Sequence, residues 1–425
     1  MSMQRRDFLK AIGAGVSTAA LSACAVSPSR SGPKVVIVGG GYGGATTAKY
    51  LSMWSNGTLD ITLVEPNAEF VSCPLSNLVL GGSKQMSFLT TSYAGLAKRG
   101  IKVLADTAQG IDPVRGTVRI SNQQDLPYDR VVLSPGIDFM YDGIQGLGTA
   151  DAQGKVLHAW KAGPQTVALR RQLEAMRDGG VYVLSIPKSP YRCPPGPYER
   201  ACQVAWYFKR AKPKSKVLVL DGNPDVTSKA GLFKKAWNDL YKGIVEYRPN
   251  HVLTDVDLAT KTAKFETADD VRASVLNVIP PHRAGGIART AGVITANNRW
   301  CEVDFLSYES IRGKGVHVLG DSIQIAPGMP KSGHMANNQA KVAAAAILRQ
   351  LGGQSPIATP MLTNTCYSFI TDKDVVHVAS VHQYDVAKKT MLAVPGSGGL
   401  SPAMNELEGR FALSWAQNIW ADTLG

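Results

Sequence analysis

The strongest constraint on the fold is a glycine-rich segment near the start of the chain. A short apolar run, KVVIV at residues 34–38, has the length and composition of a buried parallel strand and leads directly into GGGYGGATTAKYL. A second apolar run, ITLVEP at 61–66, ends in the acid Glu65. Three glycines between the two runs keep GxGxxG spacing: Gly39, Gly41 and Gly44. Strand, glycines, helix, strand and acid in this order predict a βαβ unit that binds a dinucleotide.

Each residue type in this unit has a chemical reason. Glycines permit a tight turn and let the backbone approach a pyrophosphate closely, and the free N–H groups at the start of the helix attract its negative charge. Glu65 can accept a hydrogen bond from a ribose hydroxyl. A GxGxxG motif alone is weak evidence, whereas the complete unit is specific for a dinucleotide site.

A downstream segment distinguishes between the two common dinucleotides. GVHVLGDS at 315–322 predicts a strand that ends at Asp321, and residues 332–351 predict the helix that follows. This arrangement resembles the second FAD signature of flavoproteins with two dinucleotide-binding domains, in which the aspartate binds the ribitol chain. YDRVVLSPG at 128–136 resembles the intermediate strand of such proteins. Asp321 alone would fit an ordinary turn, but together with the first unit it favours FAD over NAD.

A second βαβ unit follows, with an unusual loop. Residues 179–187 and 216–224 predict strands, the second of which contains Asp221, and 198–211 predict the helix between them. The connecting loop reads PKSPYRCPPGPYERA and keeps one glycine, Gly196. Five prolines lie in or next to it: Pro187, Pro190, Pro194, Pro195 and Pro197. Proline has no N–H donor and a fixed φ, so this loop is poorly suited to wrap a pyrophosphate. The unit therefore predicts a nucleotide-type domain without NAD, and a reductant other than NAD(P)H.

Six segments together resemble one family, the flavoprotein subunits of flavocytochrome c sulfide dehydrogenase, within the FAD-dependent pyridine nucleotide-disulfide oxidoreductases. They are RCPPGPYERA, KVVIVGGGYGGATTAKYL, HAWKAG, NVIPPHRAG, MPKSGHMANNQAKVAAAA and TNTCYSFI. The resemblance runs nearly end to end. It implies an α/β fold with two Rossmann-like domains and a C-terminal α+β interface domain. The expected boundaries are 34–154 with 286–355 for the FAD domain, 155–285 for the NAD-like domain, and 356–425 for the last.

The resemblance also implies roles for three cysteines. Cys193 and Cys366 match the two cysteines of a redox disulfide beside the flavin; the alternative is a purely structural disulfide between domains. A nucleophile such as HS⁻ can attack a disulfide and give a persulfide and a thiolate, although the sequence does not determine which sulfur is attacked first. Cys73 matches the cysteine that binds the flavin through a thioether. It is followed here by proline where a bulkier residue is expected, and the alternative is an ordinary buried thiol.

Several other residues have two interpretations each. Cys202 is an additional thiol that could pair with Cys193, and Cys301 is expected in the core. Glu199 begins a predicted helix, where it is either a general base toward H₂S or an acid favoured by the helix dipole. Trp415 lies either near the flavin or in the core.

The remaining histidines and cysteines predict no further site. His334 and His382 lack a supporting constellation and are not expected to be catalytic. No cysteine or histidine spacing is typical of a zinc site, so no metal is predicted.

The first 25 residues predict export. MSMQRRDFLKAIGAGVSTAALSACA resembles a twin-arginine signal peptide, with an amphipathic first helix as the alternative. It implies a periplasmic protein. Ala23-Cys24-Ala25 fits a cleavage site, and Leu21 to Cys24 also fits a lipoprotein box, so Cys24 is a candidate lipid anchor. No later apolar run reaches the roughly 18 residues of a membrane span.

The predicted function is sulfide oxidation through the disulfide and FAD. No CxxCH motif is present, so haem is expected only in a partner, which the resemblance identifies as a c-type, two-haem cytochrome subunit. The net charge of +13 suits an acidic partner, whereas no basic-aromatic repeat predicts nucleic-acid binding. The alternatives are a sulfide:quinone oxidoreductase, which residues 395–425 disfavour because they lack a basic amphipathic helix, and a non-catalytic persulfide-binding subunit.

Overall fold

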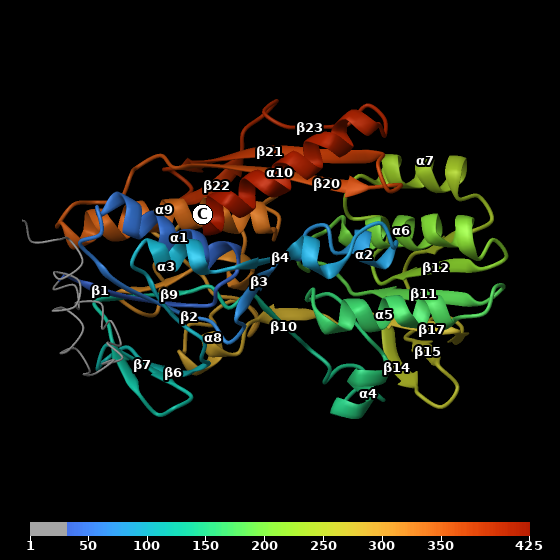
Figure 1. Ribbon diagram of the computed structural model, residues 1–425, viewed down its shortest axis with the longest axis horizontal. Coiled ribbons are helices and arrows are strands. Elements are labelled where there is room, and N and C mark those ends of the chain that lie inside the picture. Colours follow the sequence, from blue (N-terminus) through green and yellow to red (C-terminus); the bar gives the residue numbers. More distant parts are fainter. Residues whose placement is uncertain (1–31) are drawn as a thin grey trace, which may run out of the picture.

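A five-stranded parallel sheet lies at one end of the molecule in the computed structural model, which describes residues 32–425 (Figure 1). In spatial order its strands are β19 (Val316–Val318), β9 (Arg130–Leu133), β1 (Lys34–Val38), β2 (Asp60–Val64) and β5 (Lys102–Leu104). All neighbouring pairs in it are parallel. Val35 and Ile37 of the central strand are completely buried, because a parallel sheet is covered on both faces.

Helices and a small antiparallel sheet cover the two faces. Figure 1 shows α1 (Tyr42–Trp54) and α9 (Gly333–Leu351) above the parallel sheet, where they pack against each other. Below it lie three antiparallel strands, β6 (Ala108–Asp112), β7 (Thr117–Ile120) and β8 (Asp125–Pro127). The sheet is therefore open only at its edges and at the carboxyl ends of its strands.

A second parallel sheet forms the other end of the molecule. Its strands, in spatial order, are β13 (Val245–Arg248), β12 (Lys216–Asp221), β11 (Val181–Ile186) and β17 (Val275–Val278). Three helices accompany it: α5 (Pro164–Ala175), α6 (Gly196–Ala211) and α7 (Ala230–Leu240). An antiparallel sheet of β14 (Leu253–Asp257), β15 (Thr262–Phe265) and β16 (Val271–Arg272) adjoins it. The predicted pair of Rossmann-like sheets is confirmed.

Asp221, at the end of β12, already has internal partners. The buried carboxylate accepts hydrogen bonds from the Tyr198 hydroxyl at 2.7 Å, the Tyr247 hydroxyl at 3.0 Å and the Asn223 amide at 2.7 Å. An acid at this position of a dinucleotide-binding domain binds a ribose hydroxyl. Here the aromatic side chains occupy that place.

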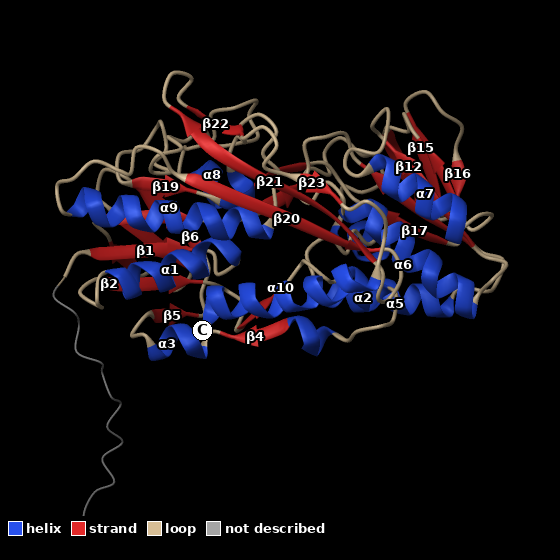
Figure 2. Cartoon of the chain, turned by 90° about the horizontal axis from the view of Figure 1, so that it is seen from above, coloured by secondary structure: helices blue, strands red, loops and turns tan. Residues whose placement is uncertain are grey.

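The last part of the chain lies across both sheets. It consists of β20 (Met361–Phe369), β21 (Val375–Asp385), β22 (Thr390–Ala393), β23 (Gly399–Leu400) and α10 (Glu406–Leu424). β20 and β21 form a long antiparallel pair that runs from α9 to α6, as both views show (Figures 1 and 2). This α+β segment follows two α/β units, so the predicted fold class is confirmed.

The remaining elements are short and complete the connections. They are β3 (Glu69–Val71), β4 (Thr90–Ser92), β10 (Ile137–Phe139), β18 (His282–Ala284), α2 (Asn77–Leu80), α3 (Ala94–Lys98), α4 (Ala150–Lys155), α8 (Ile287–Thr290), η1 (Met86–Leu89) and η2 (Gly320–Ser322). β10 and β18 pair as an antiparallel ribbon. Within residues 32–425, no helix is long and apolar enough to cross a bilayer. The predicted signal peptide and Cys24 lie outside the described residues.

Two predicted boundaries move for local reasons. The helix expected at 198–211 begins earlier, at Gly196, because Pro195 is its N-cap residue and Pro197 lies in its first turn, where a missing N–H costs nothing. The strand expected over 315–322 ends at Val318, since the chain turns at Gly320 with a φ of +75°. The expected domain boundaries stay predictions.

Candidate active site

One cavity of about 680 Å³ runs from the glycine loop of the first sheet to the proline-rich loop of the second. This volume lies in the range of small-molecule and cofactor sites. Nine of the candidate site residues named from the sequence line it: Gly39, Gly41, Glu65, Cys73, Cys193, Glu199, Asp321, Cys366 and Trp415. Residues from three parts of the chain therefore converge on a single space.

The glycine loop is built for close approach. Gly39 has a φ of +98°, which an L side chain rarely adopts, and a Cβ on Gly41 would meet nothing within 4 Å because this position faces open space. Gly44 is different, since it does not line the cavity. A Cβ at Gly44 would lie 1.8 Å from the carbonyl oxygen of Gly39, so this glycine permits the helix to pack onto the turn.

Glu65 holds the same loop in place. One carboxylate oxygen accepts a hydrogen bond from the backbone N–H of Gly40 at 2.7 Å, and the other accepts from the N–H of Asn67 at 2.9 Å. The oxygen that accepts from the N–H of Asn67 also accepts from its side-chain amide at 2.6 Å. The oxygen bonded to Gly40 keeps a second lone pair, so Glu65 can still accept from a hydroxyl in the cavity.

Asp321 has a buried oxygen that lacks a partner. Its Oδ1 is inaccessible and accepts no hydrogen bond from residues 32–425, and burial raises the pKa of the carboxyl group. Leaving a buried polar atom unpaired is costly. A hydroxyl donor in the cavity would satisfy this oxygen, and the ribitol chain of FAD carries such hydroxyls. Together with the open glycine turn, this oxygen makes the cavity fit FAD.

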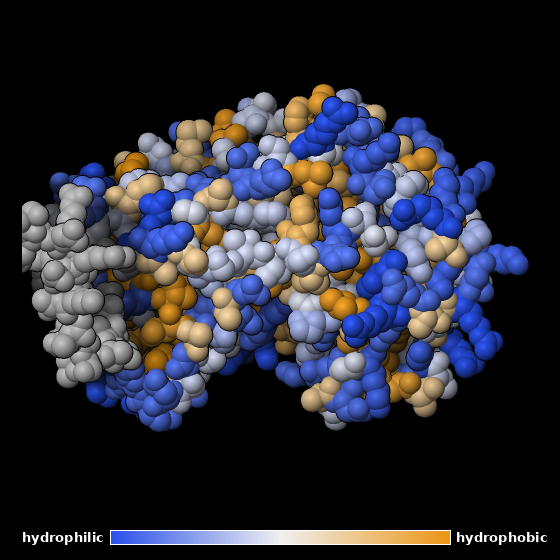
Figure 3. All heavy atoms as spheres, in the orientation of Figure 1, coloured by the Kyte–Doolittle hydropathy of each residue, from blue (hydrophilic) through white to orange (hydrophobic). Residues whose placement is uncertain are grey.

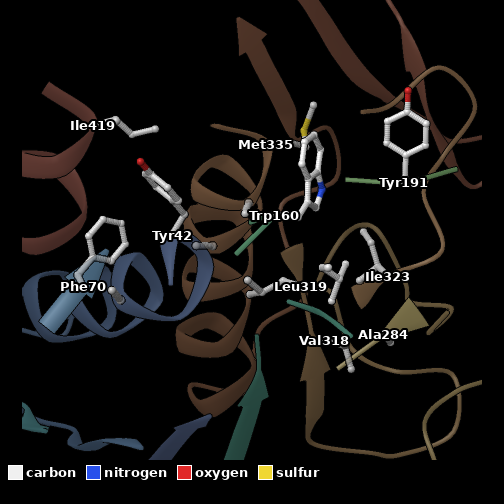
Figure 4. Close-up of a cluster of buried hydrophobic side chains, with 14 of the residues drawn as sticks. Tyr42, Phe70, Trp160, Tyr191, Ala284, Val318, Leu319, Ile323, Met335 and Ile419 are labelled. Atoms are coloured by element: carbon white, nitrogen blue, oxygen red, sulfur yellow. The ribbon is translucent and has the colours of Figure 1, made fainter. Parts of the chain in front are cut away.

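An apolar and aromatic cluster surrounds the cavity. Figure 4 shows Tyr42 and Phe70 on one side of this cluster, Trp160 near its middle and Tyr191 on the opposite side. The Tyr42 and Phe70 rings meet edge to face at 5.1 Å, and the Tyr42 hydroxyl contacts Ser72 Oγ at 2.7 Å. Tyr42 and Trp160 both line the cavity, so this packing holds two aromatic side chains of its wall in place.

The proline-rich loop presents Cys193 to the cavity. Cys193 has a φ of +58°, and its N–H donates to the carbonyl oxygen of Lys331 at 2.8 Å, which ties the loop to the start of α9. A Cβ on Gly196 would come within 2.8 Å of both Cys193 Sγ and the Trp160 ring. The single glycine of the loop is therefore required by the position of the thiol.

Cys366 reaches the same cavity from β20. Its Sγ accepts a hydrogen bond from the Asn364 amide at 3.3 Å. Burial raises the pKa of both Cys366 and Cys193, and each thiol lies within electrostatic range of Glu199. All five described cysteines are unbonded thiols, so the disulfide stays a prediction.

The other cysteines separate into two groups. Cys73 is half-buried in the cavity wall, and its Sγ accepts from the backbone N–H of Ala162 at 3.4 Å. Cys202 is completely buried, and its Sγ accepts from the Trp237 indole at 3.3 Å. Neither Cys202 nor Cys301 lines the cavity, and Cys301 is completely buried as well.

Glu199 points into the cavity from the first turn of α6. Its two oxygens accept from the Asn77 amide at 2.8 Å and from the backbone N–H of Phe369 at 2.9 Å. Burial raises its pKa. The geometry is compatible with proton transfer, and its role as a base stays a prediction.

Sequence reasoning missed several residues of this site. Lys229 lies beside Cys366, and Arg192 lies within electrostatic range of Cys73, Cys193 and Asp321. His334 lines the cavity as well: its Nδ1 accepts from the N–H of Thr365 at 3.0 Å, and its ring packs 5.7 Å from that of Trp415. Arg192 and His334 lie in segments that resemble the family, but their residue types alone gave them no role, and Lys229 lies in no such segment. His382 is buried on β21 away from the cavity.

Three family models match different parts of the chain. Residues 33–173 match the pyridine nucleotide-disulphide oxidoreductase model. Residues 166–280 match the central part of the sulfide dehydrogenase [flavocytochrome c] flavoprotein chain, and 358–424 match the flavin-binding part of flavocytochrome c sulphide dehydrogenase. The first and last of these matches support binding of FAD.

Individual proteins are similar over different lengths. The flavocytochrome c sulfide dehydrogenase flavoprotein chain of Chlorobaculum thiosulfatiphilum is 56% identical over 46 residues, which are 11% of this chain and 94% of that sequence. The mitochondrial sulfide:quinone oxidoreductase of Mus musculus is 23% identical over 302 residues, which are 68% of this chain, and the chain spans 65% of its length.

A solved structure supports the fold. The sulfide:quinone oxidoreductase from Aquifex aeolicus superposes with a TM-score of 0.74 at 19% identity, over 92% of this chain and 91% of that one.

The convergence of the FAD-type residues and the cysteines on one cavity agrees with these matches. The chain belongs to the family of flavoprotein chains of flavocytochrome c sulfide dehydrogenase, within the FAD-dependent pyridine nucleotide-disulfide oxidoreductases.

Proposed function

We propose that the protein oxidises sulfide through a Cys193–Cys366 disulfide and FAD, and passes the electrons to a c-type cytochrome subunit. The observation that carries this proposal is the single cavity, which has a dinucleotide cradle at one end and two cysteines from different parts of the chain at the other.

The cysteines perform the first step. HS⁻ attacks one sulfur of the disulfide, a new sulfur–sulfur bond forms as a persulfide, and the second cysteine sulfur leaves as a thiolate. Glu199 lies within electrostatic range of both cysteines and is placed to take the proton when H₂S enters. FAD, when bound, supplies an acceptor for two electrons that can release them one at a time.

Residues of the first sheet would hold the cofactor. The turn of Gly39 and Gly41 would receive the pyrophosphate, Glu65 the ribose, and Asp321 Oδ1 the ribitol hydroxyls. Cys73 would hold the flavin covalently. The hydrogen bonds from the Tyr198 and Tyr247 hydroxyls to the Asp221 carboxylate support the interpretation that this domain binds no NAD. A reductant other than NAD(P)H follows from it.

An exposed apolar patch formed by β23 and the first turns of α10 is the proposed docking surface for the cytochrome. Leu400, Leu407 and Phe411 are about half exposed. The Ser401 hydroxyl donates to Glu408 at 2.5 Å, which brings β23 beside the first turns of α10. Phe411 precedes Trp415, which lines the cavity, by one helical turn. Figure 3 shows apolar side chains among polar ones at the top of the molecule, where Figure 1 places β23 and α10. The net charge of +13 would attract an acidic partner.

Replacing Phe411 with glutamate is expected to slow reoxidation of the reduced flavin by cytochrome c at least about tenfold, because a central apolar contact is lost. Flavin reduction by sulfide should stay unchanged, and stopped-flow absorbance separates the two rates. Ile311→Glu is the control, since Ile311 is 62% exposed and lies outside the patch. Equal slowing in both variants would contradict this docking surface.

Export places the reaction outside the cytoplasm in this proposal. The twin-arginine segment supports a periplasmic location, with Cys24 as either a removed residue or a lipid anchor.

Anaerobic addition of sulfide to the purified protein tests the proposed activity. The flavin absorbance near 450 nm should bleach and should return on addition of cytochrome c. Absence of bleaching, with or without cytochrome, would favour a non-catalytic persulfide-binding subunit. Recovery with a quinone but not with cytochrome c would favour a sulfide:quinone oxidoreductase, the activity named for the mouse and Aquifex proteins.

A further inference from the structure

A buried lysine links the unit built on the second parallel sheet to β20, the strand that carries Cys366. Lys229 precedes α7, has a φ of +57°, and is 5% exposed. Its ammonium group donates to the carbonyl oxygen of Cys366 at 2.8 Å, to Ser368 Oγ at 2.7 Å, and to the carbonyl oxygen of Val376 at 3.4 Å. All three acceptors belong to β20 and β21, so the side chain crosses from one unit to the other.

These partners leave the positive charge of Lys229 uncompensated. None of the three acceptors carries a formal charge, and the described residues include no carboxylate within ion-pair distance of this ammonium group. Glu199 is the nearest acid in electrostatic terms, and Glu408 acts more weakly. The oxygens of Glu199 are hydrogen-bonded to Asn77 and Phe369 instead.

A second buried cation increases the imbalance. The Arg200 guanidinium is 1% exposed and donates only to neutral oxygens, those of Asn77, Asn277, His158 and Ala159. Lys229 and Arg200 are thus two buried cations near the cysteine pair without an ion-pair partner among the described residues, with Glu199 as the nearest acid. Arg192, which interacts with Asp321 as well, adds positive charge beside Cys193. Buried charge without a counterion is costly. One additional negative charge near the cysteine pair would offset the excess of buried positive charge.

A sulfur anion can supply that charge. Burial lowers the pKa of Lys229 to about 8, so the ammonium form predominates at neutral pH. Cys366 is the group that interacts most strongly with this ammonium, whereas Cys193 is influenced more by Cys366 and Glu199, both of which oppose its ionisation. Arg192 and Lys229 counteract these effects at Cys193 only in part.

We propose that Lys229 is a positioning residue that holds β20 against the cysteine loop and stabilises an anionic sulfur on Cys366 whenever the disulfide is open. The inference rests on the proposed function, because it assigns the charge left by thiol–disulfide exchange. Attack by HS⁻ breaks the bridge and leaves one negative charge on the pair, and Lys229 keeps that charge on the sulfur borne by Cys366, as a thiolate or as a persulfide anion.

The pH dependence of thiol alkylation tests this without sulfide. The full-length flavin-loaded protein is reduced, treated with iodoacetamide between pH 5 and 10, and digested, and the rate at each cysteine is read by mass spectrometry. We expect Cys366 to react with a lower midpoint pH than Cys193. Lys229→Met should raise the Cys366 midpoint by at least about one pH unit, which is a tenfold loss of thiolate below the midpoint. Lys229→Arg should keep it low.

Lys234→Met, on the exposed face of α7, is the matched control and should leave both midpoints unchanged. An unchanged Cys366 midpoint in folded Lys229→Met protein would overturn the inference. If that variant does not fold, a wild-type Cys193 midpoint below that of Cys366 would overturn it equally. Failure of sulfide to bleach the flavin would contradict the proposed activity but leave these midpoints as they are, so the two failures are distinguishable.

Discussion

Replacing Cys366 with serine should reduce the rate of sulfide-dependent flavin reduction by about 10³-fold or more, the magnitude typical for loss of a nucleophile or leaving group in covalent catalysis. Serine cannot form or exchange a disulfide, so HS⁻ has no sulfur–sulfur bond to attack. The variant should retain FAD, because the glycine turn, Glu65 and Asp321 are untouched and, within residues 32–425, Cys366 Sγ forms hydrogen bonds only with Asn364. Anaerobic stopped-flow absorbance measures the rate, and dithionite reduction measures the flavin present.

A second cysteine provides the control. Cys202 is buried against Trp237 and does not line the cavity. Cys202→Ala should therefore change the rate of flavin reduction by less than about twofold, with a cost of about 1 kcal/mol in the free energy of unfolding for the lost packing. A Cys366→Ser enzyme as fast as the wild type would exclude the two-cysteine mechanism.

Replacing Cys73 with serine should convert a covalent flavin into a dissociable one. The thiol lines the cavity wall and is only half-buried, so a flavin ring can approach it. Wild-type protein precipitated with acid should keep its yellow flavin in the pellet at about one equivalent. The variant should release essentially all of it to the supernatant, because denaturation removes every noncovalent contact. Absorbance of the two fractions measures the distribution.

Peptide mass spectrometry makes this experiment specific. The wild-type peptide that contains Cys73 should carry the mass of the flavin, and Cys301→Ser, which alters a fully buried thiol outside the cavity, should leave the flavin in the pellet. Release of flavin from the wild-type protein would show that the thioether is absent. FAD binding itself would then depend only on the glycine turn, Glu65 and Asp321.

Local patterns predicted the elements of this fold accurately. The apolar run at 34–38 forms β1 over the same residues, and the helix expected at 332–351 forms α9 from Gly333 to Leu351. Strand and helix formation depend on the spacing of apolar residues and on glycines and prolines within a few positions. The same holds for the glycine turn, whose requirement for φ > 0 at Gly39 is written into the residue type.

The residues with recognisable motifs were also accessible from the sequence. Cys73, Cys193, Cys366 and Asp321 could be singled out because each lies in a segment that resembles the family, and the structure brings all four to one cavity. Gly44 shows the limit of such reasoning. Its motif position makes Gly44 a candidate cofactor-binding residue, and that role stays a prediction. In the structure Gly44 does not line the cavity, and the missing side chain lets α1 pack onto the carbonyl oxygen of Gly39.

The sequence by itself determined the strands and helices of the two parallel sheets, because these depend on short-range patterns. Its resemblance to known flavoproteins indicated the cofactor type and singled out the cysteines. Only the tertiary structure decided what surrounds the cysteine pair. Lys229 bonds to the carbonyl oxygen of Cys366 across 137 residues, and Glu199 bonds to the N–H of Phe369 across 170. A buried charge is set by which neutral and charged groups fold around it, and no local pattern records those neighbours.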